Sequence, residues 1–238
     1  MEDCIAVIGA MDEEIAALSE GLDRLPPKGS SGLDLPIFKG RLHGQTIVVV
    51  RCRVGKVHAA LATQYVIDHF HPTIIINSGV AGGISPNVRI GDLVLGTSSV
   101  QHDFDVRYFG YTRGAIPGLE SSIFTADPRL LGLTMQAAAS ELSSDRIHQG
   151  LIVSGDQFIS SQEQKQEILN FFPDAMCAEM EGAAIAQVSS ANKVPHLIMR
   201  SISDQADNTA PQDFDQFLLD VIPVLNRVIH RLFILLQD

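Results

Sequence analysis

The 238-residue chain has no tryptophan, and aromatic residues make up only 6% of it. It has three cysteines, Cys4, Cys52 and Cys177, and none of them forms a C-x-x-C pair. A few scattered cysteines argue against a disulfide framework and against a cysteine-rich zinc module, so we expect three reduced thiols. No apolar run approaches the roughly 20 residues that a membrane-spanning helix needs.

Positive charge is also scarce, because 17 Lys and Arg face 28 Asp and Glu, for a formal net charge of −11. This sign argues against nucleic acid or an anionic membrane as the main partner. A small neutral nucleoside has no phosphates to neutralise and stays compatible with it. The acidic Met1-Glu2-Asp3 leads straight into an apolar run. That start does not resemble a signal peptide, and we expect a cytoplasmic protein.

Several familiar motifs are missing as well. No G-x-G-x-x-G dinucleotide fingerprint is present, and Gly55-Lys56 is followed by Val57, so it is not a P-loop. The segments His102-Asp103-Phe104-Asp105 and His69-Phe70-His71 lack the spacing of zinc ligands on a helix, and no cysteine is near either. We therefore expect loop residues at these positions and no metal.

What the chain does have is an alternation of strand-like and helix-like segments, which predicts an α/β fold. We expect a three-layer α/β/α sandwich with a central mixed, mainly parallel sheet, in one domain over residues 1–238. Loops are predicted at 23–35 and 101–126, and Pro223 should kink or split the last helix. The predicted strands are 5–9, 37–42, 46–54, 73–77, 92–100, 151–154, 176–180 and 196–202, and the predicted helices are 12–22, 56–69, 128–142, 162–171, 181–190 and 213–236.

Carboxylates gather where predicted strands end. Asp12-Glu13-Glu14 follows the first strand, Glu179-Met180-Glu181 ends a later one, and Asp204 ends the last. A predicted glycine-rich turn, Gly79-Val80-Ala81-Gly82-Gly83, follows the strand 73–77. Open α/β sheets bind ligands at the carboxyl ends of their strands, so these segments predict one pocket. Taken singly, each carboxylate could equally be an ordinary helix-start residue, and the glycines an ordinary tight turn.

Taken together, five segments resemble the bacterial 5′-methylthioadenosine/S-adenosylhomocysteine nucleosidases of the nucleoside phosphorylase superfamily. They are 7–14, 77–83, 153–159, 179–181 and 200–204, in the order of that family. The resemblance implies a nucleoside phosphorylase-like fold, a homodimer and no metal or organic cofactor. It also implies hydrolysis of the N-glycosidic bond of 5′-thioadenosines, such as methylthioadenosine and S-adenosylhomocysteine, and of 5′-deoxyadenosine. The products would be adenine and a 5-substituted ribose.

The same resemblance assigns roles to residues. Asp204 would be the general acid at adenine N7, Glu14 would activate the attacking water, and Glu181 would hold the ribose hydroxyls. The implied binding residues comprise Ala81 and Gly82 in the glycine-rich segment, Ser203 orienting Asp204, Met180 under the sugar, Arg200 near Glu181, Phe158 stacked on adenine and Ile159 reading its edge through the backbone. The apolar 5′ pocket would comprise Val54, Val106, Phe109, Tyr111 and Phe214, with Pro117 lent to the pocket of a neighbouring subunit.

The chemistry is independently plausible, because adenine leaves poorly as an anion and protonation at N7 lets it leave neutral. General-acid help of this kind is typically worth about 10²–10⁴-fold. An Asp has an ordinary pKa of about 3.9, so Asp204 would need a raised pKa to act near neutral pH. Burial beside the apolar residues 197–199 would supply that shift.

Some alternatives stay open. Val80, Gln157 and Thr209-Ala210-Pro211 depart from the family pattern, and they affect the sugar contact and the rim of the 5′ pocket. A futalosine-type hydrolase is one alternative, and a non-catalytic nucleoside-binding protein is another. A phosphorylase is disfavoured, since Asn77 stands where phosphorolytic relatives carry an arginine for phosphate. The sequence does not fix the 5′ substituent.

Overall fold

A computed structural model describes residues 4–26 and 35–237. Within them, ten strands form one mixed sheet, in which β1–β4, β1–β5, β5–β10, β6–β8 and β8–β9 pair in parallel and the other pairs are antiparallel. The strands are β1 (Cys4–Gly9), β2 (Asp23–Leu25), β3 (Ile37–Leu42), β4 (Gln45–Arg51), β5 (Ile74–Gly83), β6 (Leu93–Gln101), β7 (Phe124–Thr125), β8 (Ile147–Ser154), β9 (Ala175–Glu179) and β10 (His196–Asp204).

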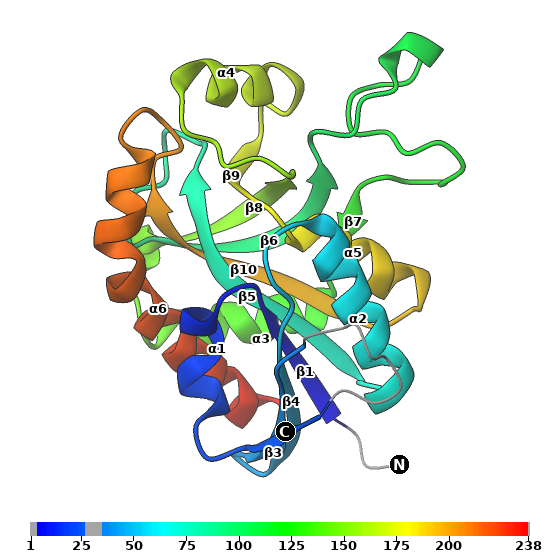
Figure 1. The fold of residues 1–238 in the computed structure, drawn as a ribbon. Helices are drawn as coiled ribbons and strands as arrows, with labels where there is room; N and C mark the ends of the chain where they lie inside the picture. The colour runs from blue at the N-terminus through cyan, green and yellow to red at the C-terminus, as the bar shows by residue number, and fades with distance from the viewer. Residues whose placement is uncertain (1–3, 27–34, 238) are drawn as a thin grey trace.

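Helices cover both faces of this sheet, as Figure 1 shows. Apolar residues of α2 and α5 pack against one face of the sheet. Apolar residues of α1, α3 and α6 pack against the other face. The predicted α/β fold with a central mixed sheet is therefore confirmed. The helices are α1 (Asp12–Ser19), α2 (Lys56–Phe70), α3 (Pro128–Ala139), α4 (Gln162–Phe171), α5 (Gly182–Ala191) and α6 (Ala210–Leu235), with short 3₁₀ helices at Arg107–Phe109 and Ser144–Arg146.

Part of the sheet closes on itself. Strand β10 pairs with β5 on one side and β6 on the other, β6 continues through β8 to β9, and β9 pairs back with β5. The remaining strands β1, β4, β3 and β2 extend from β5 as an open flank. This closed circuit brings the ends of β5, β9 and β10 to one place.

The predicted glycine-rich turn is not a turn. Residues 78–83 continue β5, and Gly79 and Gly82 have ordinary negative φ angles. These glycines do not reverse the chain; they allow side chains from other elements to lie close to the backbone of β5. A Cβ on Gly79 would lie 2.4 Å from Glu14 Oε1, and a Cβ on Gly82 would lie 2.7 Å from Asp204 Oδ1. Only a residue without a side chain leaves room for these carboxylates beside the strand.

Two other predictions need adjustment. Helix α6 begins at Ala210 and stays one helix through Pro223. A proline leaves the carbonyl four residues earlier without its helical donor, and that residue, Leu219, lies on the exposed side of α6. The predicted loop 23–35 contains β2, and its residues 27–34 lie outside the described part of the chain.

The predicted long loop 101–126 is fixed partly by contacts within the chain. Arg113 Nε donates to the carbonyl of His102 at 2.6 Å, and its Nη1 donates to Asp105 at 2.9 Å. Arg107 lies over the ring of Phe171, 4.6 Å from its centroid, which ties this segment to α4. Such contacts account for an ordered path whose regular secondary structure is limited to the 3₁₀ helix Arg107–Phe109 and the two residues of β7.

Candidate active site

A cavity of about 320 Å³ opens where the chain leaves β1, β4, β5, β8, β9 and β10. Its wall is mainly apolar with a few carboxylates, the usual make-up of a small-molecule site. The lining residues are Ala10, Met11, Glu14, Val54, Val80, Ala81, Gly82, Gln157, Phe158, Ile159, Ala178, Glu179, Met180, Glu181, Ser203, Asp204 and Phe214.

Glu14 lies in the first turn of α1 and is held by three backbone amides. Its Oε2 accepts from Ala10 N at 2.6 Å and Met11 N at 3.0 Å, and its Oε1 accepts from Val80 N at 3.1 Å. Burial raises the pKa of Glu14, while Arg200 and these amides oppose the shift. The carboxylate is therefore fixed in place and more basic than an ordinary Glu, as a base acting on water requires.

Glu179 and Glu181 differ in role although only Met180 separates them. Glu179 forms an ion pair with Arg200, accepts from Ser154 Oγ, and accepts from the amides of Glu181 and Gly182. Glu181 stands at the N-cap position of α5 without a side-chain capping bond, and it accepts from Gly55 N at 2.8 Å. Burial, then the charge of Glu179, raises the pKa of Glu181 to about 8.

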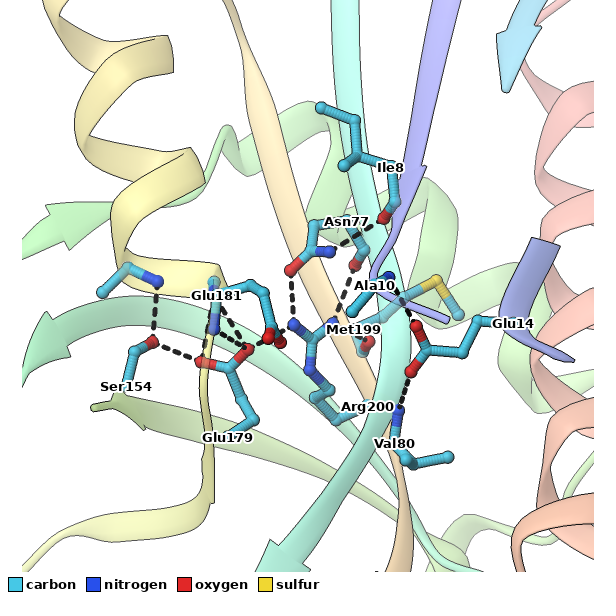
Figure 2. Close-up of polar contacts among 12 residues, drawn as sticks. Ile8, Ala10, Glu14, Asn77, Val80, Ser154, Glu179, Glu181, Met199 and Arg200 are labelled. Atoms are coloured by element: carbon cyan, nitrogen blue, oxygen red, sulfur yellow. Dashed lines mark hydrogen bonds and ion pairs between the residues drawn. The ribbon is translucent and has the colours of Figure 1, made fainter. Parts of the chain in front are cut away.

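Arg200 is 1% exposed and lies between these carboxylates and Glu14, as Figure 2 shows. It donates to Asn77 Oδ1 and to Glu179, and Asn77 in turn donates to the carbonyl of Ile8 at 2.8 Å. The guanidinium therefore bonds protein groups behind the cavity wall and does not line the cavity. It offsets part of the negative charge of three buried glutamates.

Asp204 ends β10 and is 2% exposed. Its Oδ1 accepts from Ala206 N at 2.8 Å, and its Oδ2 accepts from Ser203 Oγ at 2.9 Å. Burial is the main cause that raises the pKa of Asp204, and the two hydrogen bonds oppose it. A raised pKa makes this carboxyl a better proton donor near neutral pH.

The two carboxyl groups meet β5 at different points, Glu14 beside Gly79 and Asp204 beside Gly82. Both carboxyl groups nevertheless line the same cavity. A general acid and a general base that act on one glycosidic bond must face the same substrate in this way. The arrangement is suited to protonating a leaving group and activating a water in one cavity.

The apolar part of the wall holds two of the four predicted aromatic residues, Phe158 and Phe214. The rings of Phe158 and Phe214 meet edge to face, with centroids 5.9 Å apart. Phe158 is 43% exposed and Val54 is 47% exposed at the rim. These surfaces are available to a flat base or to an apolar substituent.

Most of the predicted site residues lie together in this wall. They are Glu14, Glu181, Asp204, Ala81, Gly82, Phe158, Ile159, Met180, Ser203, Val54 and Phe214. Arg200 lies behind the wall, bonded to Glu179 and not to Glu181. Val106, Phe109, Tyr111 and Pro117 lie on the 101–126 segment, outside the cavity wall of a single chain.

Sequence reasoning missed two positions. The sequence predicts Glu179 only as one of several strand-end carboxylates, and it assigns no place in the site to Ser154, whose hydroxyl also accepts from Ala183 N at 2.7 Å. A signal for Glu179 was present, because a glutamate in a buried strand end needs a buried cation, and Arg200 is such a cation. Ser154 carries no comparable signal.

The raised pKa of Glu181 predicts a dependence of stability on pH. Between its ordinary value of 4.5 and about 8, folded protein retains a proton that the unfolded chain releases. Stability therefore falls as pH rises through this interval. Glu181→Gln keeps an oxygen for Gly55 N but cannot ionise. We expect its Tm to exceed the wild-type value by a few degrees at pH 8, since about 1 kcal/mol shifts Tm by about 2–4 °C at this chain length.

Thermal melts at pH 5 and pH 8 measure this effect, with exposed Glu20→Gln as the control. The Glu181→Gln advantage should shrink at pH 5. An advantage of equal size at both pH values, or none at pH 8, would contradict the assignment.

Two absences apply to the described residues. Within residues 4–26 and 35–237, no group of three His, Cys, Asp or Glu side chains is placed so that it could hold a metal ion. In the same ranges, none of the helices combines the length and apolar composition of a membrane span.

Comparison with known proteins connects this cavity to a family. The model of the phosphorylase superfamily matches residues 4–236. A 5′-methylthioadenosine/S-adenosylhomocysteine nucleosidase of Staphylococcus saprophyticus is 38% identical over 228 residues, which cover 96% of this chain and 98% of the relative.

Solved structures agree. The Neisseria meningitidis 5′-methylthioadenosine/S-adenosylhomocysteine nucleosidase in complex with methylthio-immucillin-A superposes with a TM-score of 0.91 at 36% identity, covering 98% of this chain and 99% of that one. The futalosine hydrolase of Helicobacter pylori superposes with a TM-score of 0.88 at 33% identity, covering 97% of each chain. The chain therefore belongs to the phosphorylase superfamily and, within it, to the family of the 5′-methylthioadenosine/S-adenosylhomocysteine nucleosidases.

Proposed function

We propose that this protein hydrolyses the N-glycosidic bond of 5′-thioadenosines, releasing adenine and a 5-substituted ribose. Methylthioadenosine, S-adenosylhomocysteine and 5′-deoxyadenosine are the proposed substrates. The observation that carries the proposal is the pair of buried carboxyl groups with raised pKa values, Asp204 and Glu14, in one mainly apolar cavity. The nucleosidases that the chain resembles support the substrate class.

In the proposed reaction, the base enters beside Phe158 and Asp204. Asp204 donates its proton to adenine N7, so that adenine leaves neutral instead of as an anion. Ser203 and the amide of Ala206 hold the carboxylate that remains. The backbone of Ile159 is proposed to read the edge of the base.

The sugar acquires positive charge as the bond breaks, and the cavity wall presents carboxylates to it. Glu181 accepts hydrogen bonds from the ribose hydroxyls, and Met180 packs against the sugar. Glu14 takes a proton from a water that attacks the anomeric carbon. Preorganised negative charge stabilises such a cationic transition state without further reorganisation.

Water is favoured over phosphate as the nucleophile because of the charge of the wall. Among the residues that the structure describes, no lysine or arginine lines the cavity, whereas Glu14, Glu179, Glu181 and Asp204 do. Asn77 is 1% exposed and bonded to Arg200, whose own guanidinium is paired with Glu179. A phosphate anion would therefore find no cation in this wall to bind it.

One experiment tests hydrolysis directly. We expect adenine to be released from methylthioadenosine at full rate in phosphate-free buffer, with no increase when phosphate is added and free 5-methylthioribose as the second product. Release that needs phosphate and yields a sugar phosphate would assign the protein to the phosphorylases. No adenine in either buffer would refute hydrolysis of this substrate.

A futalosine-type nucleoside is the second candidate substrate. The likeness to the Helicobacter pylori futalosine hydrolase favours it specifically. The rim residues Val54, Gln157 and Phe214 would face the 5′ substituent in either case. Competition between methylthioadenosine and aminofutalosine for the same enzyme ranks the two through their kcat/KM values.

A homodimer in the cytoplasm is part of the proposal. Apolar side chains are exposed on α2 and on the 101–126 segment, among them Val57 at 69% and Phe109 at 73%. A second chain covering them would bring Val106, Phe109, Tyr111 and Pro117 near a 5′ pocket, as the family resemblance implies. Cys4, Cys52 and Cys177 are buried and none of them is in a disulfide, which suits a reducing compartment. Light scattering of the purified protein tests the dimer.

A further inference from the structure

The ammonium group of Lys165, in α4, bonds two backbone carbonyls that lie next to the cavity wall in the chain. Its Nζ donates to the carbonyl of Gly83 at 2.8 Å and to the carbonyl of Gln205 at 2.7 Å. Gly83 ends β5, directly after Gly82 of the wall, and Gln205 directly follows Asp204. Helix α4 itself follows the wall segment 157–159.

The bond to Gln205 reaches Asp204 through a single peptide unit. The carbonyl of residue 205 and the amide N–H of Ala206 belong to the same peptide group. That N–H donates to Asp204 Oδ1 at 2.8 Å. A cation on the oxygen of a peptide polarises its N–H, which strengthens the bond from that N–H to a carboxylate.

The peptide also needs to be held. Ala206 is fully buried and has φ of +50°, a left-handed conformation that costs a residue with a Cβ about 1 kcal/mol or more. A Cβ on Gly82 would lie 3.0 Å from the Ala206 Cβ. A turn of this kind persists only when its surroundings fix it, and the ammonium of Lys165 is bonded to the carbonyl of Gln205 in the same turn.

We propose that Lys165 is a positioning residue for Asp204, acting through the 205–206 peptide while it ties α4 and the end of β5 to the same point. The inference rests on the proposed nucleosidase activity with Asp204 as the acid. Lys165 itself does not line the cavity and is not a catalytic residue.

The charged groups around Asp204 set the expected pH response. Asp207, in the loop after β10, and Asp213, on α6, raise the pKa of Asp204, and Lys165 from α4 is the cation on this side. Removal of that cation should raise the pKa of Asp204 further. Because the acid must carry a proton, the high-pH limb of kcat/KM should move to higher pH.

The test compares Lys165→Met with Lys165→Arg and with a control, exposed Lys39→Met on β3. We expect Lys165→Met to lower kcat on methylthioadenosine about tenfold, the effect of one charge-assisted hydrogen bond. KM should change little, and the high-pH limb should shift upward. Lys165→Arg should restore most of kcat and the wild-type limb, and Lys39→Met should match wild type.

A double variant separates positioning from general damage. In an Asp204→Asn background, Lys165→Met should lower the residual rate less than twofold, because the group it positions is gone. A second tenfold loss there, or an unshifted limb with wild-type kcat in Lys165→Met, would overturn the inference. If Lys165→Met does not fold, Lys165→Gln decides by the same readouts. A wild-type enzyme that releases no adenine would refute the proposed function instead.

Discussion

Asp204→Asn is expected to lower kcat on methylthioadenosine by about 10²–10⁴-fold, the usual contribution of a general acid. The amide keeps the shape of the side chain. Its oxygen can still accept from Ala206 N, and its nitrogen can donate to Ser203 Oγ. The variant should therefore fold normally and bind a non-cleavable methylthioadenosine analogue with near wild-type Kd, while it cannot protonate N7.

The choice of substrate sharpens this test. A nucleoside whose base leaves readily without protonation should lose much less rate in Asp204→Asn than methylthioadenosine does. Exposed Asp145→Asn is the matched control and should behave as wild type. Near-native turnover of methylthioadenosine by Asp204→Asn would remove Asp204 as the acid.

Glu14→Gln is the second substitution with a large expected effect, a fall in kcat of about 10²–10³-fold from the loss of a general base. Glu14 must be ionised to act, and its pKa is raised by burial, so wild-type kcat/KM should fall as pH is lowered through that pKa. This low-pH limb should be absent from the Glu14→Gln profile. If kcat/KM of Glu14→Gln still falls at low pH as it does in wild type, another group is the base.

Glu14→Gln should also be less stable than wild type. The carboxylate accepts three amides through two oxygens, whereas a glutamine has one acceptor oxygen. Either Val80 N or the pair at Ala10 and Met11 must lose its partner, at a cost of about 1–3 kcal/mol for a buried unsatisfied group. Urea unfolding measures this cost, and the activity assay should be run where the variant is fully folded.

The order of strands and helices could be predicted from the sequence because buried strands and amphipathic helices differ in apolar periodicity. The strand 73–77 ends early in the prediction because Gly79, Gly82 and Gly83 are typical of turns. In the structure they accommodate carboxylates from α1 and β10. That reason involves residues more than 60 positions away, and no local pattern contains it.

The site residues divide in a similar way. Glu14 and Asp204 could be placed because each stands at the end of a predicted strand. The different roles of Glu179 and Glu181 could not be predicted. Side chains alternate along a strand, so two residues at positions 179 and 181 of one strand would lie on the same face. Strand β9 ends at Glu179, and Glu181 leaves it with φ −134° and ψ −39° as the cap of α5. Val106, Phe109, Tyr111 and Pro117 remain predictions that depend on a second chain.

The closed circuit of strands has a consequence for how the protein is made. Strand β10 inserts between β5 and β6, yet it lies more than 90 residues after both in the chain. A growing chain on the ribosome can pair β1, β4 and β5 early, but it cannot close the circuit until β10 has left the exit tunnel. Since β10 also carries Arg200, Ser203 and Asp204, the proposed catalytic centre should be among the last parts to form. We expect nascent chains that stop before β10 to bind no nucleoside and to expose the edges of β5 and β6 to chaperones or to aggregation.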